Sequence, residues 1–395
     1  MQFRPVSKPQ VGIHNFVTRI ALAPGGFDTP SAMASGYSTT GYTFSEESML
    51  SFNPALKFVP PSDWLKITAI DAHTGGEPFR VIVDGFPELK GDTILEKRRY
   101  AKENYDHLRT ALMWEPRGHA DMYGCILTPP VTQGANFGIL FIHNEGFSTM
   151  CGHGIIGIAT VVLETGMMPM VSPITEIKID SPAGRITAFA HIENSHVKNV
   201  SFLNVPSFVS ELDAVVDVPE LGKVRYDLAF GGAFYAYVNA KDVGVTCSPQ
   251  DYRPLIEKGM AIKRAVMQTK QIAHPFEKDL GFLYGTIFVD EPQDPASHSR
   301  NVCIFADGEV DRSPTGTGVS GRLAIHHARG EIQVCEVVTI ESIIGSKFDG
   351  RVFDEATFGP HAAIIPEVRG EAHIVGRNEL WIDPNDPFSS GFILR

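Results

Sequence analysis

A chain of 395 residues is too long for one ordinary hydrophobic core and predicts two or three domains. Hydrophobic residues make up 43% and charged residues 20%, with 37 Gly and 27 Pro, which excludes a disordered or fibrous protein. The 46 acidic residues outnumber the 34 basic ones, and the resulting net charge of −12 argues against nucleic-acid binding because it repels phosphate.

Residues 1–60 differ in amino-acid composition from the rest of the chain. Turn formers are frequent, and no acidic residue precedes Asp28, whereas Arg4, Lys8 and Arg19 do. An acid-poor start is compatible with a mitochondrial transit segment, although we favour an irregular extension packed on, or trailing from, the folded body. The apolar core of a secretory signal peptide is missing.

From residue 65 onward, short β-rich segments alternate with turn signals. The predicted strands are residues 65–70, 80–83, 138–142, 174–179 and 185–192, and the longest predicted helix is 94–113. Strands and helices do not alternate regularly, which favours an α+β fold over a doubly wound parallel sheet.

The cysteines and the hydropathy pattern indicate the compartment. The five cysteines are odd in number, widely spaced and without a CxxC pair, so we expect reduced thiols and neither a disulfide framework nor a zinc site. The longest nearly unbroken apolar run, residues 154–163, is about half a membrane span. We therefore expect a soluble, cytoplasmic protein without a membrane partner.

Two Gly-rich segments repeat with a shift of 164 residues, as from Gly152 to Gly316. The coinciding glycines are Gly152, Gly154, Gly157 and Gly166 in the first segment and Gly316, Gly318, Gly321 and Gly330 in the second. This many coincidences predict two related halves. We expect the first half at residues 61–205, joined by the C-terminal segment 370–395, and the second half at 206–369.

Each Gly-rich turn predicts the start of a helix of about a dozen residues, closed by Gly166 or Gly330. The unpaired N–H groups of the first turn and the helix dipole favour an anion there. Residues 155–163 are apolar on nearly every face, so the first helix should be buried. Two related halves would place both helix starts across one cleft, with a small carboxylate ligand between Cys151 and Thr315.

The same glycines also match the G-x-G-x-x-G pattern of dinucleotide-binding folds, and Asp180 follows the first copy by about 20 residues. The context disagrees, because residues 145–150 separate the first copy from its strand. Pro314 precedes the second copy and cannot donate to a strand ladder. A nicotinamide-dependent enzyme is therefore the weaker alternative.

Cys151 is the strongest candidate for chemistry. At a helix start among N–H donors, a thiol is expected to have a pKa of roughly 3.5–7.5 instead of about 8.5, and its thiolate can act as nucleophile or general base. A papain-like pair is another option, but no matching local signature is present. The other four cysteines are expected to be small buried hydrophobes.

Four further side chains have either a functional or a structural interpretation. His153 could orient substrate or move protons, or be a structural histidine. Asp311 could hold an ammonium or iminium group, or be a turn residue. His73 and His143 lack metal-ligand spacing, so we expect no metal site.

These motifs together resemble the proline racemase family over about residues 65–395. They are residues 150–154 (MCGHG), 311–318 (DRSPTGTG) and 73–81 (HTGGEPFRV), with 117–124 and 143–146 in addition. The resemblance implies a diaminopimelate-epimerase-like fold of two pseudo-symmetric halves, each with a β-barrel-like sheet around a central helix. It also implies no metal, no pyridoxal phosphate or other cofactor, and commonly a homodimer.

Racemases and epimerases of this family use two cysteines on opposite faces of the substrate α-carbon. Here the positions hold Cys151 and Thr315, and a Thr hydroxyl is too weak an acid to replace a thiol. The combination looks like the trans-3-hydroxy-L-proline dehydratases of the family, which act in hydroxyproline catabolism. In that chemistry a single cysteine takes the α-proton, the 3-hydroxyl leaves as water, and the product becomes Δ1-pyrroline-2-carboxylate.

By the same resemblance, the substrate carboxylate and amine should contact Gly152, His153, Gly316 and Thr317, with Asp311 at the ring nitrogen. Thr315 and His153 are both candidates to protonate the departing hydroxyl. The alternatives are a proline racemase or hydroxyproline 2-epimerase, and a binding protein that has lost turnover.

Overall fold

The computed structural model describes residues 57–394, and residues 60–395 form one compact unit. The expectations for residues 1–60, including a transit segment, fall almost wholly outside the described residues. Within the described part, no helix is both long enough and apolar enough to cross a membrane.

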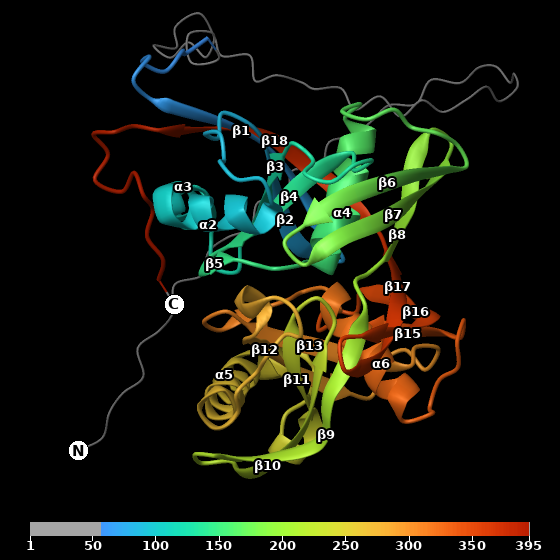
Figure 1. The fold of residues 1–395 in the computed structure, drawn as a ribbon. Coiled ribbons are helices and arrows are strands. Elements are labelled where there is room, and N and C mark those ends of the chain that lie inside the picture. The colour runs from blue at the N-terminus through green and yellow to red at the C-terminus, as the bar shows by residue number, and fades with distance from the viewer. Residues whose placement is uncertain (1–56, 395) are drawn as a thin grey trace, which may run out of the picture. The chain divides into compact units, whose positions relative to one another are not determined.

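In the first half of the compact unit, a closed ring of strands surrounds helix α4 (Gly152–Glu164), as Figure 1 shows. Neighbours in this ring pair in the order β18, β1, β2, β3, β4, β6, β7, β8, and the end of β17 pairs with β8 to close it. The strands are β1 (Leu65–Thr74), β2 (Glu77–Asp84), β3 (Tyr123–Thr128), β4 (Phe137–His143), β6 (Ile174–Ser181), β7 (Gly184–Glu193), β8 (His196–Leu203), β17 (His361–Gly370) and β18 (Ala372–Ile382), with the short β5 (Gly146–Phe147) beside β4.

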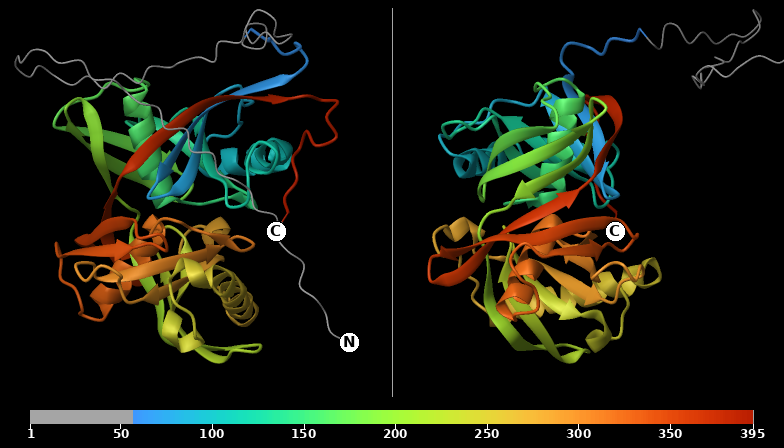
Figure 2. Two further views of the ribbon diagram at one scale, coloured as in Figure 1. Left: turned by 180° about the vertical axis from the view of Figure 1, so that it is seen from behind. Right: turned by 90° about the vertical axis from the view of Figure 1, so that its right-hand side faces the viewer.

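In the second half, a similar ring surrounds helix α6 (Gly316–Ala328) (Figure 2). Its strands pair in the order β9, β10, β11, β12, β13, β15, β16, β17, and β17 returns to β9. They are β9 (Ser207–Val218), β10 (Gly222–Phe230), β11 (Phe234–Asn239), β12 (Leu283–Asp290), β13 (Ser299–Phe305), β15 (Val337–Glu341) and β16 (Lys347–Phe358), with the short β14 (Glu309–Val310) beside β13.

The two rings share one topology, pair by pair. The parallel pairs are β2–β3 and β4–β6 in the first half, and β11–β12 and β13–β15 in the second. Each first pair is joined through outer helices, α2 (Ile94–Asn104) and α3 (Asp106–Met113) or α5 (Tyr252–Thr269), and each second pair through the central helix. The pseudo-symmetry predicted from the repeated glycines is therefore confirmed. That each half is a domain with the expected boundaries stays a prediction.

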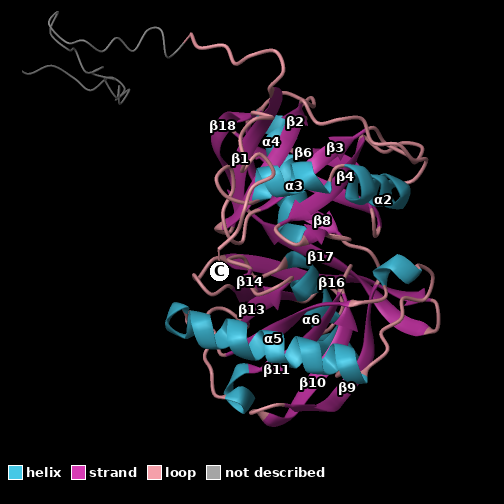
Figure 3. Cartoon of the chain, turned by 90° about the vertical axis from the view of Figure 1, so that its left-hand side faces the viewer, coloured by secondary structure: helices cyan, strands magenta, loops and turns pink. Residues whose placement is uncertain are grey.

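The predicted strands are all present, extended by a few residues, but the predicted helix 94–113 is wrong in one respect. It is two helices, because Tyr105 leaves the helical region with φ −131° and ψ 20°. The longest helix of the described part is instead α5, which lies along the outside of the second half (Figure 3).

The central helices have the ends that the glycines predict. Gly166 and Gly330 follow α4 and α6 with φ of +74° and +70°, the left-handed conformation typical of a helix C-terminus. The side chains of residues 155–163 are all buried, as their continuous apolar character predicts. Each central helix is therefore held inside its ring of strands, and its N-terminus has a fixed position there.

Candidate active site

The starts of the two central helices touch each other. A Cβ built on Gly152 would lie 2.5 Å from the Gly316 Cα, and one built on Gly316 would lie 2.6 Å from the Gly152 Cα. Only glycine allows so close an approach of two backbones. The N–H groups of both helix starts are thereby brought to one place, which favours an anion such as a carboxylate.

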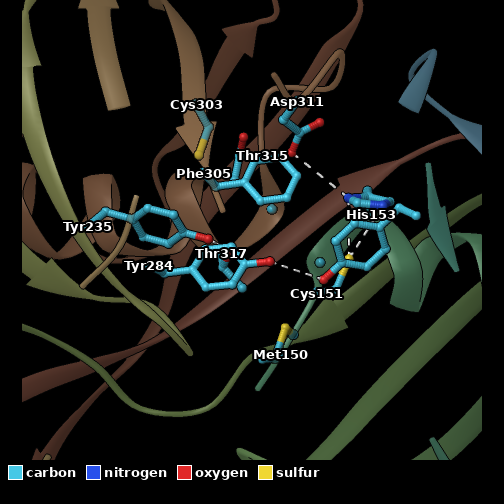
Figure 4. Close-up of a pocket in the computed structure, with 13 residues that line it drawn as sticks. Met150, Cys151, His153, Tyr235, Tyr284, Cys303, Phe305, Asp311, Thr315 and Thr317 are labelled. Carbon is cyan, nitrogen blue, oxygen red and sulfur yellow. Dashed lines mark hydrogen bonds and ion pairs between the residues drawn. The ribbon is translucent and has the colours of Figure 1, made fainter. Parts of the chain in front are cut away.

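A cavity of about 270 Å³, its mouth included, lies beside these helix starts. All seven residues selected from the sequence line it: Cys151, Gly152, His153, Asp311, Thr315, Gly316 and Thr317 (Figure 4). Six residues that sequence reasoning missed line it as well: Tyr123, Met150, Tyr235, Tyr284, Cys303 and Phe305.

Cys151 caps α4 from an extended backbone, and its Sγ accepts a hydrogen bond from the Gly154 N–H at 3.2 Å. The predicted lowering of its pKa is wrong for this geometry. Burial raises the pKa of the Cys151 thiol well above its ordinary value, and the Asp311 carboxylate raises it further, whereas the Gly154 N–H and the Tyr123 hydroxyl lower it. Desolvation of a thiolate that is 4% exposed outweighs one or two hydrogen bonds.

His153 connects the thiol with Asp311. Its Nδ1 and Nε2 lie 3.3 and 3.4 Å from the Cys151 Sγ, and Nδ1 lies 3.9 Å from the Asp311 Oδ2 (Figure 4). The Thr74 hydroxyl donates to the His153 carbonyl at 2.9 Å, which fixes the backbone there. Burial lowers the pKa of His153 and Asp311 opposes this, so the imidazole is neutral near pH 7.

Asp311 is a buried carboxylate facing the cavity. One oxygen accepts from the Ser313 N–H at 2.7 Å, and the other has the distant His153 ring. A buried carboxylate is costly unless a cation or several donors approach it. The arrangement is suited to a protonated amine bound in the cavity.

Thr315 occupies the position in α6 that Cys151 occupies in α4, but its backbone conformation is different. Its φ is +66° and its ψ 97°, and its side chain makes no capping hydrogen bond. Its Oγ1 is buried beside the thiol of Cys303, whose raised pKa it moderates. Strained backbone of this kind costs about 1–3 kcal/mol and is concentrated at functional sites.

Three tyrosines around the cavity each form a hydrogen bond with another side chain. The Tyr235 hydroxyl lies 2.7 Å from the Thr317 Oγ1, and the Tyr123 hydroxyl lies 3.4 Å from that of Tyr284. Burial raises the pKa of all three phenols, which keeps them protonated. Tyr123 and Tyr284 begin the equivalent regions of β3 and β12, each followed by Gly, and this second repeat was the signal that could have found them.

The cysteines depart from the expectation in two places. Cys303 lines the cavity, because β13 leads directly into the segment that carries Asp311. Cys335 is exposed, whereas Cys125 and Cys247 are buried as expected.

The dinucleotide interpretation of the glycines is wrong. Both helices that they open lie inside closed rings of strands and not against an open parallel sheet. The carboxylate of Asp180 is already used by the N–H groups of Val131 and Thr132 at 2.9 and 2.8 Å.

The histidines considered as metal ligands have other neighbours. His73 lies against His373, with ring centroids 5.3 Å apart, and the Nδ1 of His143 lies 3.5 Å from a carboxylate oxygen of Glu309. In the described part of the chain, no group of three or more His, Cys, Asp and Glu residues could hold a metal ion.

Comparison with known families agrees with this architecture. The family described as Proline racemase matches residues 69–393, which is most of the compact unit. The chain belongs to the proline racemase family. It is therefore a member of an enzyme family, and it has an α+β, diaminopimelate-epimerase-like fold, as the motifs predicted.

Three relatives define what the chain is similar to. A protein of Colwellia psychrerythraea named trans-3-hydroxy-L-proline dehydratase is 49% identical over 337 residues, covering 85% of this chain and 95% of the relative. A protein of Burkholderia multivorans named 3-hydroxyproline 2-epimerase is 44% identical over 329 residues, covering 83% and 98%. The crystal structure of a hydroxyproline epimerase from Agrobacterium vitis with bound trans-4-hydroxy-L-proline superposes with a TM-score of 0.81 at 33% identity, covering 85% and 96%.

Proposed function

We propose that the chain is a hydro-lyase that converts trans-3-hydroxy-L-proline into Δ1-pyrroline-2-carboxylate and water. The observation that carries the proposal is the pairing of Cys151 with Thr315 at equivalent positions of the two helix starts, one thiol and one hydroxyl on a shared cavity. The 49% identity to a relative named for this activity supports it.

The substrate is an amino acid with a carboxylate and a cationic ring nitrogen, and the cavity offers a partner for each. The carboxylate would receive the N–H groups at Gly152, His153, Gly316 and Thr317, at the positive ends of both helices. The amine would face Asp311. This orientation puts the α-carbon between the Cys151 Sγ and the Thr315 Oγ1.

Binding of the cation changes the state of the thiol. In the free site, burial and the Asp311 carboxylate keep Cys151 protonated. A positively charged amine close to the thiol favours the thiolate and offsets the carboxylate. The Cys151 thiolate then takes the α-proton as general base, and the electrons expel the 3-hydroxyl as the enamine forms. The enamine tautomerises to the cyclic imine.

The residue on the substrate face opposite Cys151 explains why inversion of the α-carbon is not expected. A second base would have to deliver a proton to the face opposite Cys151, and Thr315 is the residue there. An aliphatic hydroxyl is too weak an acid, and its alkoxide too unstable in a buried site, for this role near neutral pH. Elimination needs no such proton at the α-carbon.

The proposed reaction requires no cofactor, because it is redox-neutral and the charge developing at the α-carbon leaves with the hydroxyl. Its partner is then a small hydroxyproline-like molecule. A homodimer and a cytoplasmic location stay predictions.

The decisive experiment is a substrate screen over proline and its 3- and 4-hydroxy isomers in D2O. We expect trans-3-hydroxy-L-proline to give a product trapped by a carbonyl reagent or reduced by a ketimine reductase, without accumulation of an inverted substrate. The similarity to proteins named epimerases favours the second candidate, a hydroxyproline 2-epimerase. Inverted, deuterated substrate without loss of water would establish that alternative.

A further inference from the structure

The stereochemistry of the substrate limits which group can protonate the departing hydroxyl, given the proposed function. In trans-3-hydroxy-L-proline, the hydroxyl and the carboxylate lie on opposite faces of the ring. The α-hydrogen also lies opposite the carboxylate, so the α-hydrogen and the hydroxyl share a face. Since Cys151 removes that hydrogen, the hydroxyl leaves on the Cys151 side and away from Thr315.

Tyr123 is a proton donor on the Cys151 side. It belongs to the same half as Cys151, is 2% exposed and lines the cavity. Its ring makes an edge-to-face contact with His153 at 4.8 Å, and its hydroxyl lies 3.4 Å from that of Tyr284. The Tyr123 hydroxyl is also one of the groups that lower the pKa of the Cys151 thiol, which means that it neighbours the sulfur.

His153 is less suited to this role. Both of its ring nitrogens lie within 3.4 Å of the Cys151 Sγ, and its Nδ1 faces Asp311. Since burial lowers the pKa of His153, the ring lacks a second proton near neutral pH. It serves better to hold the thiol in place.

Tyr284 connects this position with the outside. It lines the active-site cavity and also a larger outer groove that includes Arg98 and Lys263. Its hydroxyl backs that of Tyr123 from the second half of the molecule. A departing water beside these phenols is therefore next to the outer groove.

We propose that the elimination is syn and that the Tyr123 hydroxyl, backed by Tyr284, protonates the departing 3-hydroxyl. The Cα–H electrons form the Cα–Cβ double bond, and the Cβ–O electrons leave with the oxygen. The thiolate of Cys151 gains the α-proton, and the Tyr123 hydroxyl gives its proton to the oxygen, forming water. The new thiol then returns its proton to the Tyr123 oxygen, which restores both groups with no net change in protons.

The test compares two leaving groups in wild-type enzyme and in Tyr123→Phe. Fluoride is a far weaker base than hydroxide and leaves without a proton. We therefore expect the substitution to slow water loss from trans-3-hydroxy-L-proline by about 100-fold, the lower range for a general acid. Fluoride loss from trans-3-fluoro-L-proline should slow by a much smaller factor, about tenfold or less, because only the effect of Tyr123 on the Cys151 pKa is lost there. Residual fluoride loss also demonstrates that the variant is folded and that Cys151 still works.

The matched control is Tyr235→Phe, which removes another buried phenol from the same cavity, one that contacts Thr317. It should slow both leaving groups by the same factor. A second arm uses cis-3-hydroxy-L-proline, whose hydroxyl lies on the Thr315 side, and we expect its water loss to be at least about 100-fold slower than that of the trans isomer.

Equal effects of Tyr123→Phe on water and fluoride loss, no effect on either, or comparable turnover of the cis isomer would each overturn the proposal. A wild-type enzyme that releases neither water nor fluoride would instead overturn the proposed function, and the relay with it.

Discussion

The two helix starts have the same scaffold but different chemistry. In the first half, Cys151 has an extended backbone with φ −146°, and its sulfur caps the helix through the Gly154 N–H. In the second half, Thr315 has φ +66°, and its buried side chain does not cap the helix. The glycines that follow, Gly152 and Gly316, are nevertheless in contact with each other.

The difference separates what the fold requires from what the reaction requires. Both halves need glycine for the close approach and N–H groups for an anion. In the proposed reaction, only the first half needs a group that accepts a proton from carbon. A hydroxyl on the second face leaves the scaffold intact and removes the second acid, which favours elimination over inversion.

The largest effect is expected from Cys151→Ser. The serine hydroxyl can still cap α4, but it cannot act as a base near neutral pH, so water loss should fall by about 1,000-fold. Steady-state assays with trans-3-hydroxy-L-proline measure this. The exposed Cys335→Ser is the control and should retain wild-type turnover. A Cys151→Ser variant within tenfold of wild type would exclude Cys151 as the base.

The contact between the halves is tested by Gly152→Ala and Gly316→Ala. Each added methyl would meet the opposite backbone at 2.5–2.6 Å, which must push the helix starts apart. We expect about 100-fold lower kcat/KM from a misplacement of about 1 Å, and about 1–3 kcal/mol lower stability in urea unfolding. Gly376→Ala, where no atom lies within 4 Å of the added Cβ, should be silent. Normal activity in both helix-start variants would refute the close-approach argument.

The pH dependence follows from the raised pKa of Cys151. Because burial holds this pKa well above its ordinary value, the Cys151 thiol of the free enzyme is protonated at neutral pH. The thiolate fraction, and with it kcat/KM, should rise about tenfold per pH unit from pH 7 to about pH 9. Measuring kcat/KM across this interval checks it, and a plateau below pH 8 would contradict a raised pKa.

A smaller effect is a gain of function in Thr315→Cys. A thiol on the second face could supply the missing acid, but its backbone at φ +66° is not arranged for it. We expect proline racemisation at roughly 1% of the wild-type dehydration rate, since an imperfectly placed group loses about 100-fold. A chiral assay detects the D-isomer. Thr315→Ser should give no D-proline. Similar amounts of D-proline from both variants would show that residue 315 does not supply the proton on the second face of the α-carbon.

The smallest effect is expected for Glu77→Gln, at a contact between the halves. Burial, followed by the Asp311 carboxylate, raises the pKa of Glu77 well above its ordinary value, which favours the neutral carboxyl group. Its Oε2 accepts from the Arg312 N–H at 2.7 Å, and glutamine keeps that acceptor. Unfolding free energy should change by less than about 1 kcal/mol, whereas Glu77→Ala should cost about 2 kcal/mol or more. Equal losses for both would indicate an ionised Glu77.

The sequence by itself determined the features that depend on neighbouring residues. Repeated glycines predicted two helices with equivalent ends and two related halves, since left-handed turns and capped helix starts are local properties. The unbroken apolar run predicted that α4 is buried. The cavity residues 151–153, Asp311 and 315–317 were identified because they flank these turns.

The tertiary structure decided what depends on distant residues. Tyr235 and Cys303 reach the cavity only because separate strands close into rings, and no pattern in sequence specifies that meeting. The sign of the Cys151 pKa shift was decided in the same way. The stabilising N–H lies three residues away and is visible in the sequence, whereas the desolvation that outweighs it comes from the whole packed interior.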